Sequence, residues 1–294
     1  MAQRLGYVSA HQFRNWTIEP SVINAHSISK CIALLSVVAI AHAALSQDAK
    51  VSEQYGAKRL DFAVEGFQGF VVLPPNASTT ELIPWVWYAP TFIGVYPNDG
   101  HAWMTTQLLD AGFAIAGVDV GESYGSPKGV AAYSAFFDHV VSEYSLATKA
   151  CLLPQSRGGL MLLNWAVENV SRVQCVAGIY TVCNLESYPG LARACGAYEL
   201  SEEALRDTLE SHNPIDRLKP LAEANTPLLF IHGDSDTVVP IEANAGELVA
   251  RILSLGGNAQ LITIPGKGHE EVPEFFQSKP FITFLLNQGD PSNQ

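Results

Sequence analysis

Two kinds of segment alternate along the chain from about residue 58 to the C-terminus. Eight short apolar or alternating runs predict strands over residues 60–65, 69–73, 85–89, 113–120, 150–153, 173–182, 227–232 and 259–264. Between them, apolar positions with helical spacing predict helices over residues 101–110, 130–144, 159–170, 241–255 and 273–286. The run at 113–120 is almost continuously apolar, as expected of a strand that is covered on both faces.

This alternation predicts an α/β fold in which helices flank a mostly parallel, eight-stranded sheet. No internal repeat or Pro/Ser-rich linker divides residues 47–294, so we expect a single domain there. Residues 184–218 interrupt the alternation and have helical spacing around 202–209. Because this stretch is longer than a usual connection, it predicts a small cap over one end of the sheet.

The first 46 residues have the pattern of an export signal. Lys30 precedes an apolar run of about 12 residues, and a small-residue motif follows at residues 41–43. We therefore expect residues 1–46 to be a leader with a secretory signal, and the mature protein to be secreted or periplasmic. A bilayer span needs about 20 apolar residues, so the mature chain is expected to have no stable membrane span. A buried N-terminal helix and a membrane anchor that is retained after export are the alternatives.

Composition narrows the range of partners. Hydrophobic residues make up 48% of the chain and charged residues 16%, which allows a sizeable core. A net charge of −12 without any Lys/Arg-rich run argues against nucleic acid and anionic membrane surfaces as partners. Neither a CxxC motif nor a Cys/His cluster with zinc spacing is present, so we expect no metal and no cofactor. The oligomeric state is left open.

Four cysteines follow the leader. Cys183 and Cys195 fall in the same loop-rich stretch and are the preferred disulfide pair of an exported protein, although connectivity cannot be read from sequence. Cys151 and Cys175 lie in apolar runs that predict strands, where a buried free thiol is the commoner state.

A candidate nucleophile stands between a predicted strand and a predicted helix. The string L-L-P-Q-S-R-G-G at residues 152–159 leads an apolar strand into Ser156, then into two glycines and a helix. This is the context of a nucleophile elbow, in which a tight turn lifts the serine hydroxyl above the strand ends. The G-x-S-x-G form of the motif would have glycine at position 154, where this chain has Pro154.

Two further strings supply a candidate acid and a candidate base. The buried strand at 227–232 runs into H-G-D-S-D-T-V-V-P at residues 232–240, and the next strand is followed by G-K-G-H at 266–269. With these residues the chain resembles the α/β-hydrolase superfamily from about residue 58 onward. The resemblance implies the α/β-hydrolase fold, with Ser156 as nucleophile, Asp236 as acid and His269 as base, in the chain order Ser, Asp, His.

The three residue types suit acyl transfer. A serine hydroxyl needs a base to remove its proton, and histidine titrates near neutral pH. A carboxylate orients the imidazole and stabilises the imidazolium. Asp234 is a rival acid that is more often a loop-holding residue, and Glu186 is a second rival. His232 is expected to pack or to form a local hydrogen bond. Asp119 is expected to be structural, and Glu270 and Glu271 are expected to be acidic residues at the start of a helix. A catalytic role is the alternative for each of these three acids.

The superfamily resemblance also implies an oxyanion hole. Its donors would be the backbone N–H of Arg157, next to the nucleophile, and that of Thr91 in the loop after the third predicted strand, where Pro90 has no N–H. The HGGG form of that loop is absent. In glucuronoyl esterases, which are similar at this position, a serine–arginine pair brings the guanidinium to the developing oxyanion. The Arg157 side chain could alternatively bind a substrate carboxylate or pair with a scaffold carboxylate such as Glu122.

Aromatic residues gather near the same predicted strand ends. Trp85 and Trp87 are two residues apart in a predicted strand, so their side chains lie on the same face of it, and at least one of them is expected in the core. Four others are candidates for a substrate pocket that stacks on a sugar or aryl group: Phe92, Tyr96, Trp103 and Tyr124.

These features predict a serine hydrolase that cleaves small-molecule carboxylic esters, with a carbohydrate or aryl ester as candidate substrate. A small exopeptidase and a lactone-opening hydrolase are the alternatives within the enzymes. A catalytically silent binding protein on the same scaffold is the alternative outside them, since a fold alone does not assign a substrate.

Overall fold

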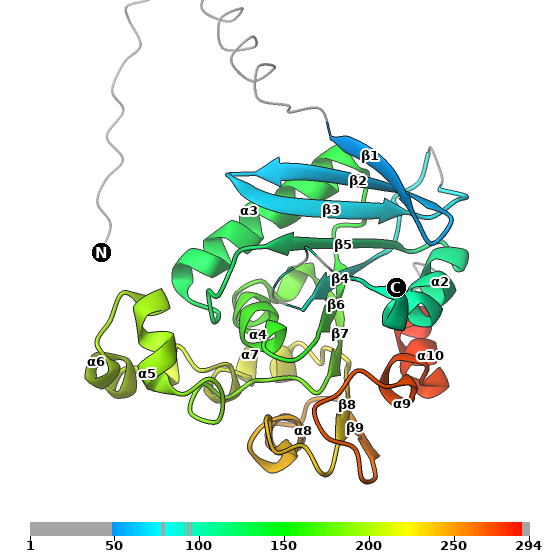
Figure 1. Ribbon diagram of the computed structural model, residues 1–294. Helices are drawn as coiled ribbons and strands as arrows, with labels where there is room; N and C mark the ends of the chain where they lie inside the picture. Colours follow the sequence, from blue (N-terminus) through cyan, green and yellow to red (C-terminus); the bar gives the residue numbers. More distant parts are fainter. Residues whose placement is uncertain (1–48, 78–79, 91, 93, 95, 290–294) are drawn as a thin grey trace, which may run out of the picture. The chain divides into compact units, whose positions relative to one another are not determined.

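A nine-stranded sheet is the central element of the computed structural model, which describes residues 49–77, 80–90, 92, 94 and 96–289 (Figure 1). The strands follow the order β1-β2-β3-β5-β4-β6-β7-β8-β9. β1, β2, β3 and β5 pair antiparallel, and β5, β4 and β6 to β9 pair parallel. The strands are β1 (Lys50–Gln54), β2 (Ala57–Val64), β3 (Phe67–Leu73), β4 (Trp85–Ala89), β5 (Ala114–Asp119), β6 (Ala150–Pro154), β7 (Val173–Ile179), β8 (Leu228–Gly233) and β9 (Ala259–Ile264).

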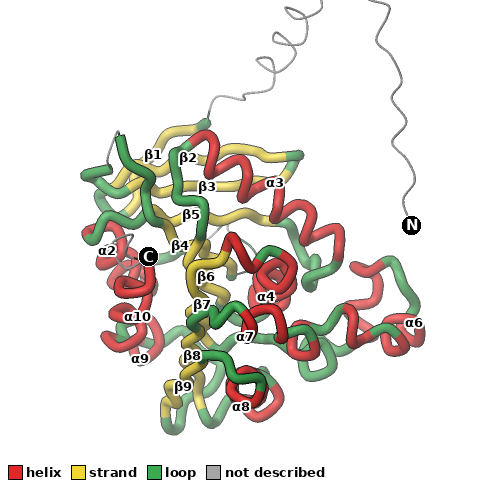
Figure 2. The backbone as a smooth tube through the Cα atoms, turned by 180° about the vertical axis from the view of Figure 1, so that it is seen from behind, coloured by secondary structure: helices red, strands yellow, loops and turns green. Residues whose placement is uncertain are grey.

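Helices cover both faces of this sheet, which confirms the predicted α/β architecture (Figures 1 and 2). One face is covered by α3 (Pro127–Glu143), α4 (Gly158–Glu168), α7 (Lys219–Glu223) and α8 (Ala245–Ser254). The other is covered by α2 (Ala102–Asp110), α9 (Pro273–Phe276) and α10 (Lys279–Gly289).

The side chains of β4 show how the core is divided between the two faces. Trp85 and Trp87 pack on the side of α3 and α4, whereas Val86 and Tyr88 pack on the side of α2 and α10. All four side chains are almost fully buried. A strand that is buried on both faces has no polar alternation, which is why the central strands are continuous apolar runs in the sequence.

The expectation of eight strands was one short, because β1 gives no signal in the sequence. Its residues, K-V-S-E-Q, are polar apart from one valine, and four of its five positions are exposed. β1 lies at the edge of the sheet and is held by antiparallel backbone pairing with β2, from Lys50 opposite Asp61 to Gln54 opposite Ala57. Backbone pairing without burial of side chains leaves no hydrophobic period to detect.

The inserted segment between β7 and β8 forms a small cluster of its own. It contains α5 (Leu191–Ala194), the short helix η3 (Cys195–Tyr198) and α6 (Glu202–Asp207), which lie beside the layers in Figure 1. Leu191, Tyr198 and Leu205 pack with Leu160 of α4. The Tyr198 hydroxyl also donates to the backbone carbonyl of Tyr124 at 2.8 Å. These contacts tie the segment to the β5–α3 loop.

The preferred disulfide between Cys183 and Cys195 is not present, and the four cysteines of the described chain are all free. Cys183 is fully buried in the core under α4 and α8. Cys195 lies in the inserted segment, partly exposed, and its thiol contacts the Ala192 carbonyl at 3.4 Å. The two thiols belong to different clusters, so closeness in sequence does not bring them together.

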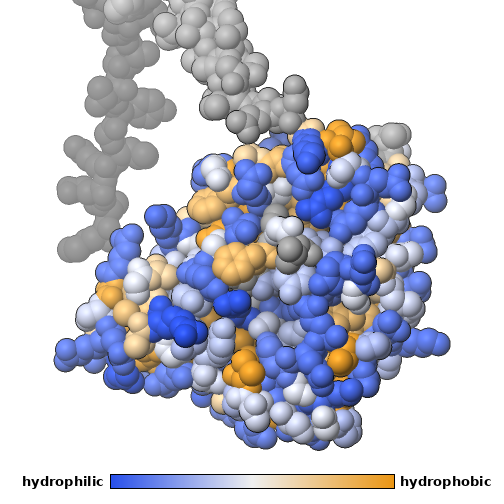
Figure 3. Space-filling model, viewed as in Figure 1, coloured by the Kyte–Doolittle hydropathy of each residue, from blue (hydrophilic) through white to orange (hydrophobic). Residues whose placement is uncertain are grey.

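None of the described helices has both the length and the apolar composition to cross a membrane. The face of the molecule shown in Figure 3 is mostly hydrophilic, and hydrophobic side chains are scattered over it. The leader expected at residues 1–46 lies outside the described residues.

Candidate active site

Ser156 occupies the turn between β6 and α4. Its φ of 51° lies in the left-handed region, which is strained for a residue with a side chain and typical of functional turns. The backbone of Ser156 is held from both sides, since its N–H donates to Ile179 O at 3.0 Å and its carbonyl accepts from Val182 N at 2.9 Å. Both partners lie at or just beyond the end of β7, so the neighbouring strand fixes the turn.

The two glycines after Arg157 let α4 begin against backbone atoms. A Cβ at Gly158 would lie 1.8 Å from Ala89 O, and a Cβ at Gly159 would lie 2.2 Å from Val182 O. Neither carbonyl can move easily, because both belong to the segments that surround the turn. The S-R-G-G string therefore follows from close packing at the start of α4.

Pro154 replaces the glycine of the more common elbow motif without disturbing the turn. It is the last residue of β6 and pairs with Ala89 of β4. Its carbonyl accepts a hydrogen bond from Thr181 Oγ1 at 3.3 Å. The φ that proline imposes is compatible with an extended strand end, so the substitution is accommodated.

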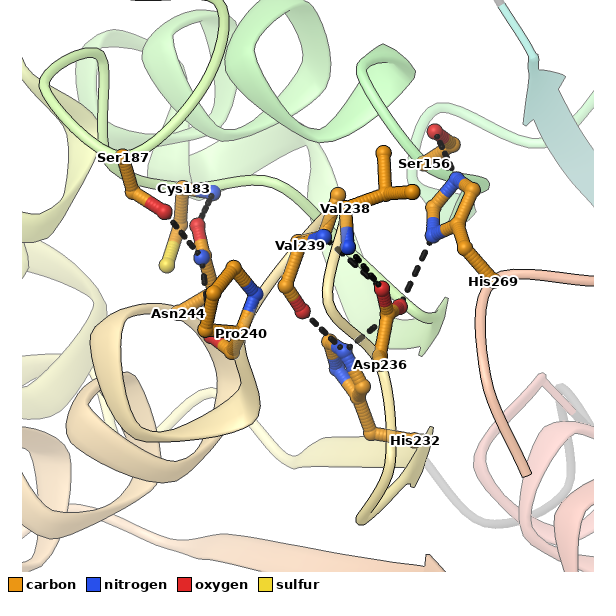
Figure 4. Close-up of polar contacts among 10 residues, drawn as sticks. All are labelled: Ser156, Cys183, Ser187, His232, Asp236, Val238, Val239, Pro240, Asn244 and His269. Carbon is orange, nitrogen blue, oxygen red and sulfur yellow. Dashed lines mark hydrogen bonds and ion pairs between the residues drawn. The ribbon is translucent and has the colours of Figure 1, made fainter. Parts of the chain in front are cut away.

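His269 lies between Ser156 and Asp236 (Figure 4). Ser156 Oγ is 2.8 Å from His269 Nε2, and His269 Nδ1 is 2.8 Å from Asp236 Oδ2. Because an ionised carboxylate only accepts hydrogen bonds, the imidazole proton lies on Nδ1, and Nε2 is left to accept from the serine hydroxyl. The structure thus brings the three predicted residues together in an arrangement that can activate a serine hydroxyl.

The Asp236 carboxylate is buried and fully hydrogen-bonded. Its Oδ1 accepts from the backbone N–H groups of Val238 and Val239 at 2.9 and 2.8 Å, and its Oδ2 also lies 3.3 Å from His232 Nε2 (Figure 4). Burial alone would raise the pKa of Asp236, but the hydrogen bonds from His232, His269 and Val239 outweigh it and hold the pKa well below its usual range. The carboxylate therefore stays ionised beside His269.

The rival acids are placed away from the imidazole. Asp234 Oδ1 accepts from Gly266 N at 2.7 Å and from the Ser235 hydroxyl at 2.9 Å, so it holds the loop as expected. Glu186 is exposed and lies 3.6 Å from Arg206. Asp119 caps its own turn by accepting from Gly121 N at 2.9 Å. The structure brings only Asp236 of these acids to the His269 ring.

The backbone N–H and the side chain of Arg157 have separate roles in the site. Its N–H donates to no backbone carbonyl of the described chain, as an oxyanion donor requires. Its guanidinium donates to Glu122 Oε1 at 2.6 Å and lies over the Phe92 ring, with 5.6 Å from Cζ to the ring centroid. The side chain is thus paired with the scaffold carboxylate that the sequence suggested. Thr91, the second expected oxyanion donor, lies outside the described residues.

A pocket of about 250 Å³ opens onto Ser156 and His269. Phe92 and Tyr96 line it, as expected. Tyr124 and Trp103 do not line this pocket, so the prediction that they belong to it was wrong. Tyr124 has a φ of 47° and packs into the cluster of the inserted segment, and Trp103 packs on the α2 side of the sheet.

Four residues that line this pocket were not expected there from the sequence: Gln155, Tyr180, Glu270 and Glu271. Gln155 accepts from the Tyr88 hydroxyl, and its Nε2 lies 2.8 Å from Tyr180 Oη and 3.3 Å from Glu271 Oε1. Glu271 does not start a helix, because α9 begins at Pro273. Gln155 therefore links the nucleophile turn to the loop that carries the histidine.

Tyr180 supports the base directly. Its ring lies against the His269 ring, with 4.5 Å between the centroids. Burial and the nearby Glu271 carboxylate raise the pKa of Tyr180, so the phenol remains a neutral hydrogen-bond partner of Gln155. The only sequence signal for Gln155 was its position next to the serine, and the only signal for Glu271 was its position two residues after the histidine. Tyr180, which directly follows β7, gave no signal.

The fold and the site together define an α/β-hydrolase, with Ser156 after β6, Asp236 after β8 and His269 after β9. The profile of the prolyl oligopeptidase family matches residues 129–279, a range that contains all three residues. The chain belongs to this family.

Known proteins with similar sequence or structure include both esterases and peptidases. Acyl-protein thioesterase 1 of Gibberella zeae is 39% identical over 80 residues, which are 26% of this chain and 32% of the relative. S-formylglutathione hydrolase of Agrobacterium tumefaciens has a TM-score of 0.62 at 14% identity, over 81% of this chain and 95% of that one. A putative dipeptidyl aminopeptidase IV of Bacteroides ovatus has a TM-score of 0.64 at 14% identity, over 82% of this chain and 36% of that one. The chain matches about a third or less of the length of its curated relatives.

Proposed function

We propose that this protein is a serine hydrolase that cleaves carboxylic esters through an acyl-enzyme. The observation that carries the proposal is the chain of two 2.8 Å contacts from Ser156 Oγ through His269 to Asp236. It is supported by the strained turn that holds Ser156 and by the burial of the Asp236 carboxylate. Family membership and the likeness to an acyl-protein thioesterase support the same class of reaction.

The geometry assigns a role to each residue. Ser156 Oγ attacks the ester carbonyl carbon while His269 Nε2 takes the hydroxyl proton, and Asp236 stabilises the imidazolium. The tetrahedral intermediate collapses to an acyl-serine as His269 returns that proton to the leaving alcohol. A water molecule then attacks the acyl carbon, passing a proton to His269, and the acid leaves as the proton returns to Ser156 Oγ. The Arg157 N–H, and that of Thr91, are the proposed donors to the oxyanion.

The pocket favours a small ester over a peptide. It has a volume of about 250 Å³ and is lined by Phe92 and Tyr96, which suits the acyl or aryl part of a small ester. Peptide hydrolysis is the second candidate, because the family and the dipeptidyl aminopeptidase likeness both include peptidases. Lactone opening uses the same steps, with the leaving alcohol still attached to the acyl group.

One comparison separates these candidates. Purified protein is given 4-nitrophenyl acetate and, separately, an amino-acid 4-nitroanilide, with the Ser156→Ala variant as the control. We expect release of 4-nitrophenol that depends on Ser156, at a kcat/KM at least about a hundredfold above that for the anilide. Faster cleavage of the anilide would make the protein a peptidase, and no turnover of esters, lactones or anilides would favour a binding protein.

We also propose that the protein is exported and that its leader is removed by cleavage just before a residue between 44 and 47. The proposal rests on Lys30, the apolar run after it and the small-residue motif at residues 41–43. N-terminal sequencing of protein recovered from the exported fraction should find a start between residues 44 and 47. Exported protein that still begins at Met1 would contradict it.

A further inference from the structure

The Gln155 side chain is bonded to two residues that support the candidate base. Gln155 directly precedes Ser156 and is only 4% exposed. Its Nε2 donates to Tyr180 Oη at 2.8 Å and to Glu271 Oε1 at 3.3 Å. Tyr180 lies against the His269 ring, and Glu271 belongs to the same loop as His269. A single buried amide therefore connects the nucleophile turn with the ring and the loop of the base.

The hydrogen bonds determine which end of the amide faces which neighbour. An ionised carboxylate only accepts hydrogen bonds, so the amide nitrogen of Gln155 must face Glu271. The amide oxygen is then left to accept from the Tyr88 hydroxyl. Glutamate has the same length but offers two acceptors, and methionine offers no donor. The site therefore requires an amide at position 155, and a side chain of similar size does not replace it.

The hydrogen bonds of His269 do not fix the tilt of its ring. The bonds to Ser156 Oγ and Asp236 Oδ2 both start from ring nitrogens, whose proton and lone pair point outward in the ring plane. The ring can still tilt out of line with the serine unless its face is supported, and small misplacements of a reacting group slow a reaction strongly. Tyr180 supplies that support, with 4.5 Å between the ring centroids. Its φ of 35° is a strained value that the surrounding contacts must maintain.

We propose that Gln155 is a positioning residue of the catalytic site. Its amide holds Tyr180 against the His269 ring, and through Glu271 it ties the histidine loop to the nucleophile turn. The inference rests on the proposed function and adds a requirement that the three catalytic residues do not contain. Gln155 makes no bond to the substrate in this role, so its loss should slow the attack by the serine.

Gln155→Glu tests the need for the amide nitrogen while it keeps the size of the side chain. The variant puts an acceptor where a donor faced Glu271, so that two carboxylates repel each other in place of one hydrogen bond. We expect kcat/KM for 4-nitrophenyl acetate at pH 8 to fall at least about tenfold. Labelling of Ser156 by a fluorophosphonate probe should slow by a similar factor, because both reactions need an aligned base.

Exchanging the two side chains should restore the site. When Gln155→Glu is combined with Glu271→Gln, the new amide at position 271 can donate to the new carboxylate at position 155. Its oxygen can still accept from Asn98 Nδ2, which bonds Glu271 Oε2 at 3.2 Å in the wild type. We expect the double variant to recover to within about threefold of wild-type kcat/KM. Glu271→Gln alone should not exceed the wild type, so the recovery would be specific to the exchanged pair.

The pH dependence separates a lost donor from an added charge. In Gln155→Glu the two carboxyl groups can share a proton at lower pH, and the protonated group donates again, so the ratio of wild-type to variant kcat/KM should rise from about pH 6.5 to 9. A charge that merely stabilised the imidazolium of His269 would have the opposite effect, since it would leave less neutral base at low pH. Burial raises the pKa of Tyr88 and Tyr180 and lowers the pKa of His101, so these neighbours stay neutral over that range.

Gln174→Glu is the matched control. Gln174 is the second residue of β7, and its Nε2 also donates to an oxygen, the Gln288 carbonyl at 2.8 Å. Along the strand it lies about 20 Å from Tyr180, at about 3.3 Å a residue. We expect its kcat/KM and labelling rate to stay within about twofold of wild type at every pH. Thermal melts check that each variant is folded.

The outcomes distinguish this proposal from the proposed function. A folded Gln155→Glu variant that is as active as the wild type, or a folded exchanged pair no better than that variant, would overturn the role of Gln155 and leave ester hydrolysis intact. Labelling rates in the expected order, in a protein whose wild type hydrolyses no ester, would support the role of Gln155 and reject the proposed substrate. A folded wild type whose Ser156 is not labelled would overturn both.

Discussion

The guanidinium of Arg157 donates to the Glu122 carboxylate at 2.6 Å, one residue beyond the candidate nucleophile. Both side chains are about a third exposed, so the pair itself contributes on the order of 1 kcal/mol or less to the free energy of unfolding. Its larger effect is to hold the guanidinium over Phe92 at the edge of the pocket. The pair therefore fixes the position of the guanidinium beside the catalytic pocket.

This pairing predicts that Glu122→Ala reproduces the kinetic effect of Arg157→Ala. If the carboxylate positions the guanidinium, the double variant should be hardly worse than either single variant in kcat/KM for an aryl acetate. A loss of about a hundredfold in kcat for Arg157→Ala, with Glu122→Ala close to wild type, would instead show that the side chain donates to the oxyanion. Steady-state kinetics of the three variants decides between these outcomes.

Gly158→Ala should destabilise the protein and abolish most of its activity. The new Cβ would lie 1.8 Å from Ala89 O, so α4 must shift away from β4 and carry Ser156 out of place. We expect a loss of about 3 kcal/mol in the free energy of unfolding by chemical denaturation. Gly196→Ala is the matched control, because its Cβ would meet nothing, and its stability should stay within about 0.5 kcal/mol of wild type. Equal stability of the two variants would contradict the packing described for the elbow.

The pH dependence of stability should show the environment of Asp236. Its pKa is lower in the folded protein than in the unfolded chain, so the stability that it contributes is present above the unfolded pKa of about 3.9. That contribution is lost as the pH falls below this value. The stability difference between wild type and Asp236→Asn should shrink by about 1 kcal/mol or more as the pH falls from about 4 toward 2. A difference that is independent of pH would contradict the low pKa.

The cysteines should behave as free thiols. Cys195 is partly exposed, whereas Cys151, Cys175 and Cys183 are buried. In the folded protein without its leader, a thiol reagent should modify one cysteine rapidly and all four after denaturation. The melting temperature should not change with a reductant. A mass 2 Da below that of the reduced chain would instead show that a disulfide forms.

The sequence predicted the layers of the fold because the central strands are buried on both faces. Runs such as residues 113–120 and 173–182 are apolar at nearly every position, and few other structures give that pattern. β1 was missed because its contribution is backbone pairing at an edge, with side chains that face solvent. The same difference explains the cysteines, since burial of Cys183 and exposure of Cys195 depend on contacts between distant segments.

The three residues of the candidate triad could be predicted because each sits in a motif with a fixed relation to a strand end. The pocket could not be predicted in the same way. Tyr124 follows β5 as expected, but its left-handed backbone places its side chain in the cluster of the inserted segment. Gln155 and Glu271 lie 116 residues apart and meet only because the segment after β9 reaches back past β8 and β7 to the end of β6. Side-chain direction in turns is set by backbone geometry that the residue pattern does not contain.

Covalent labelling of the serine tests the proposed hydrolase most directly. A fluorophosphonate probe reacts with a serine hydroxyl only where a base removes its proton, which is the role of His269 here. Wild-type protein should be labelled at Ser156, as mapped by peptide mass spectrometry. Ser156→Ala should not be labelled, and His269→Ala should be labelled at least about a thousandfold more slowly. Folded wild-type protein that stays unlabelled, or that carries the probe at another residue, would contradict the assignment of Ser156 as the nucleophile.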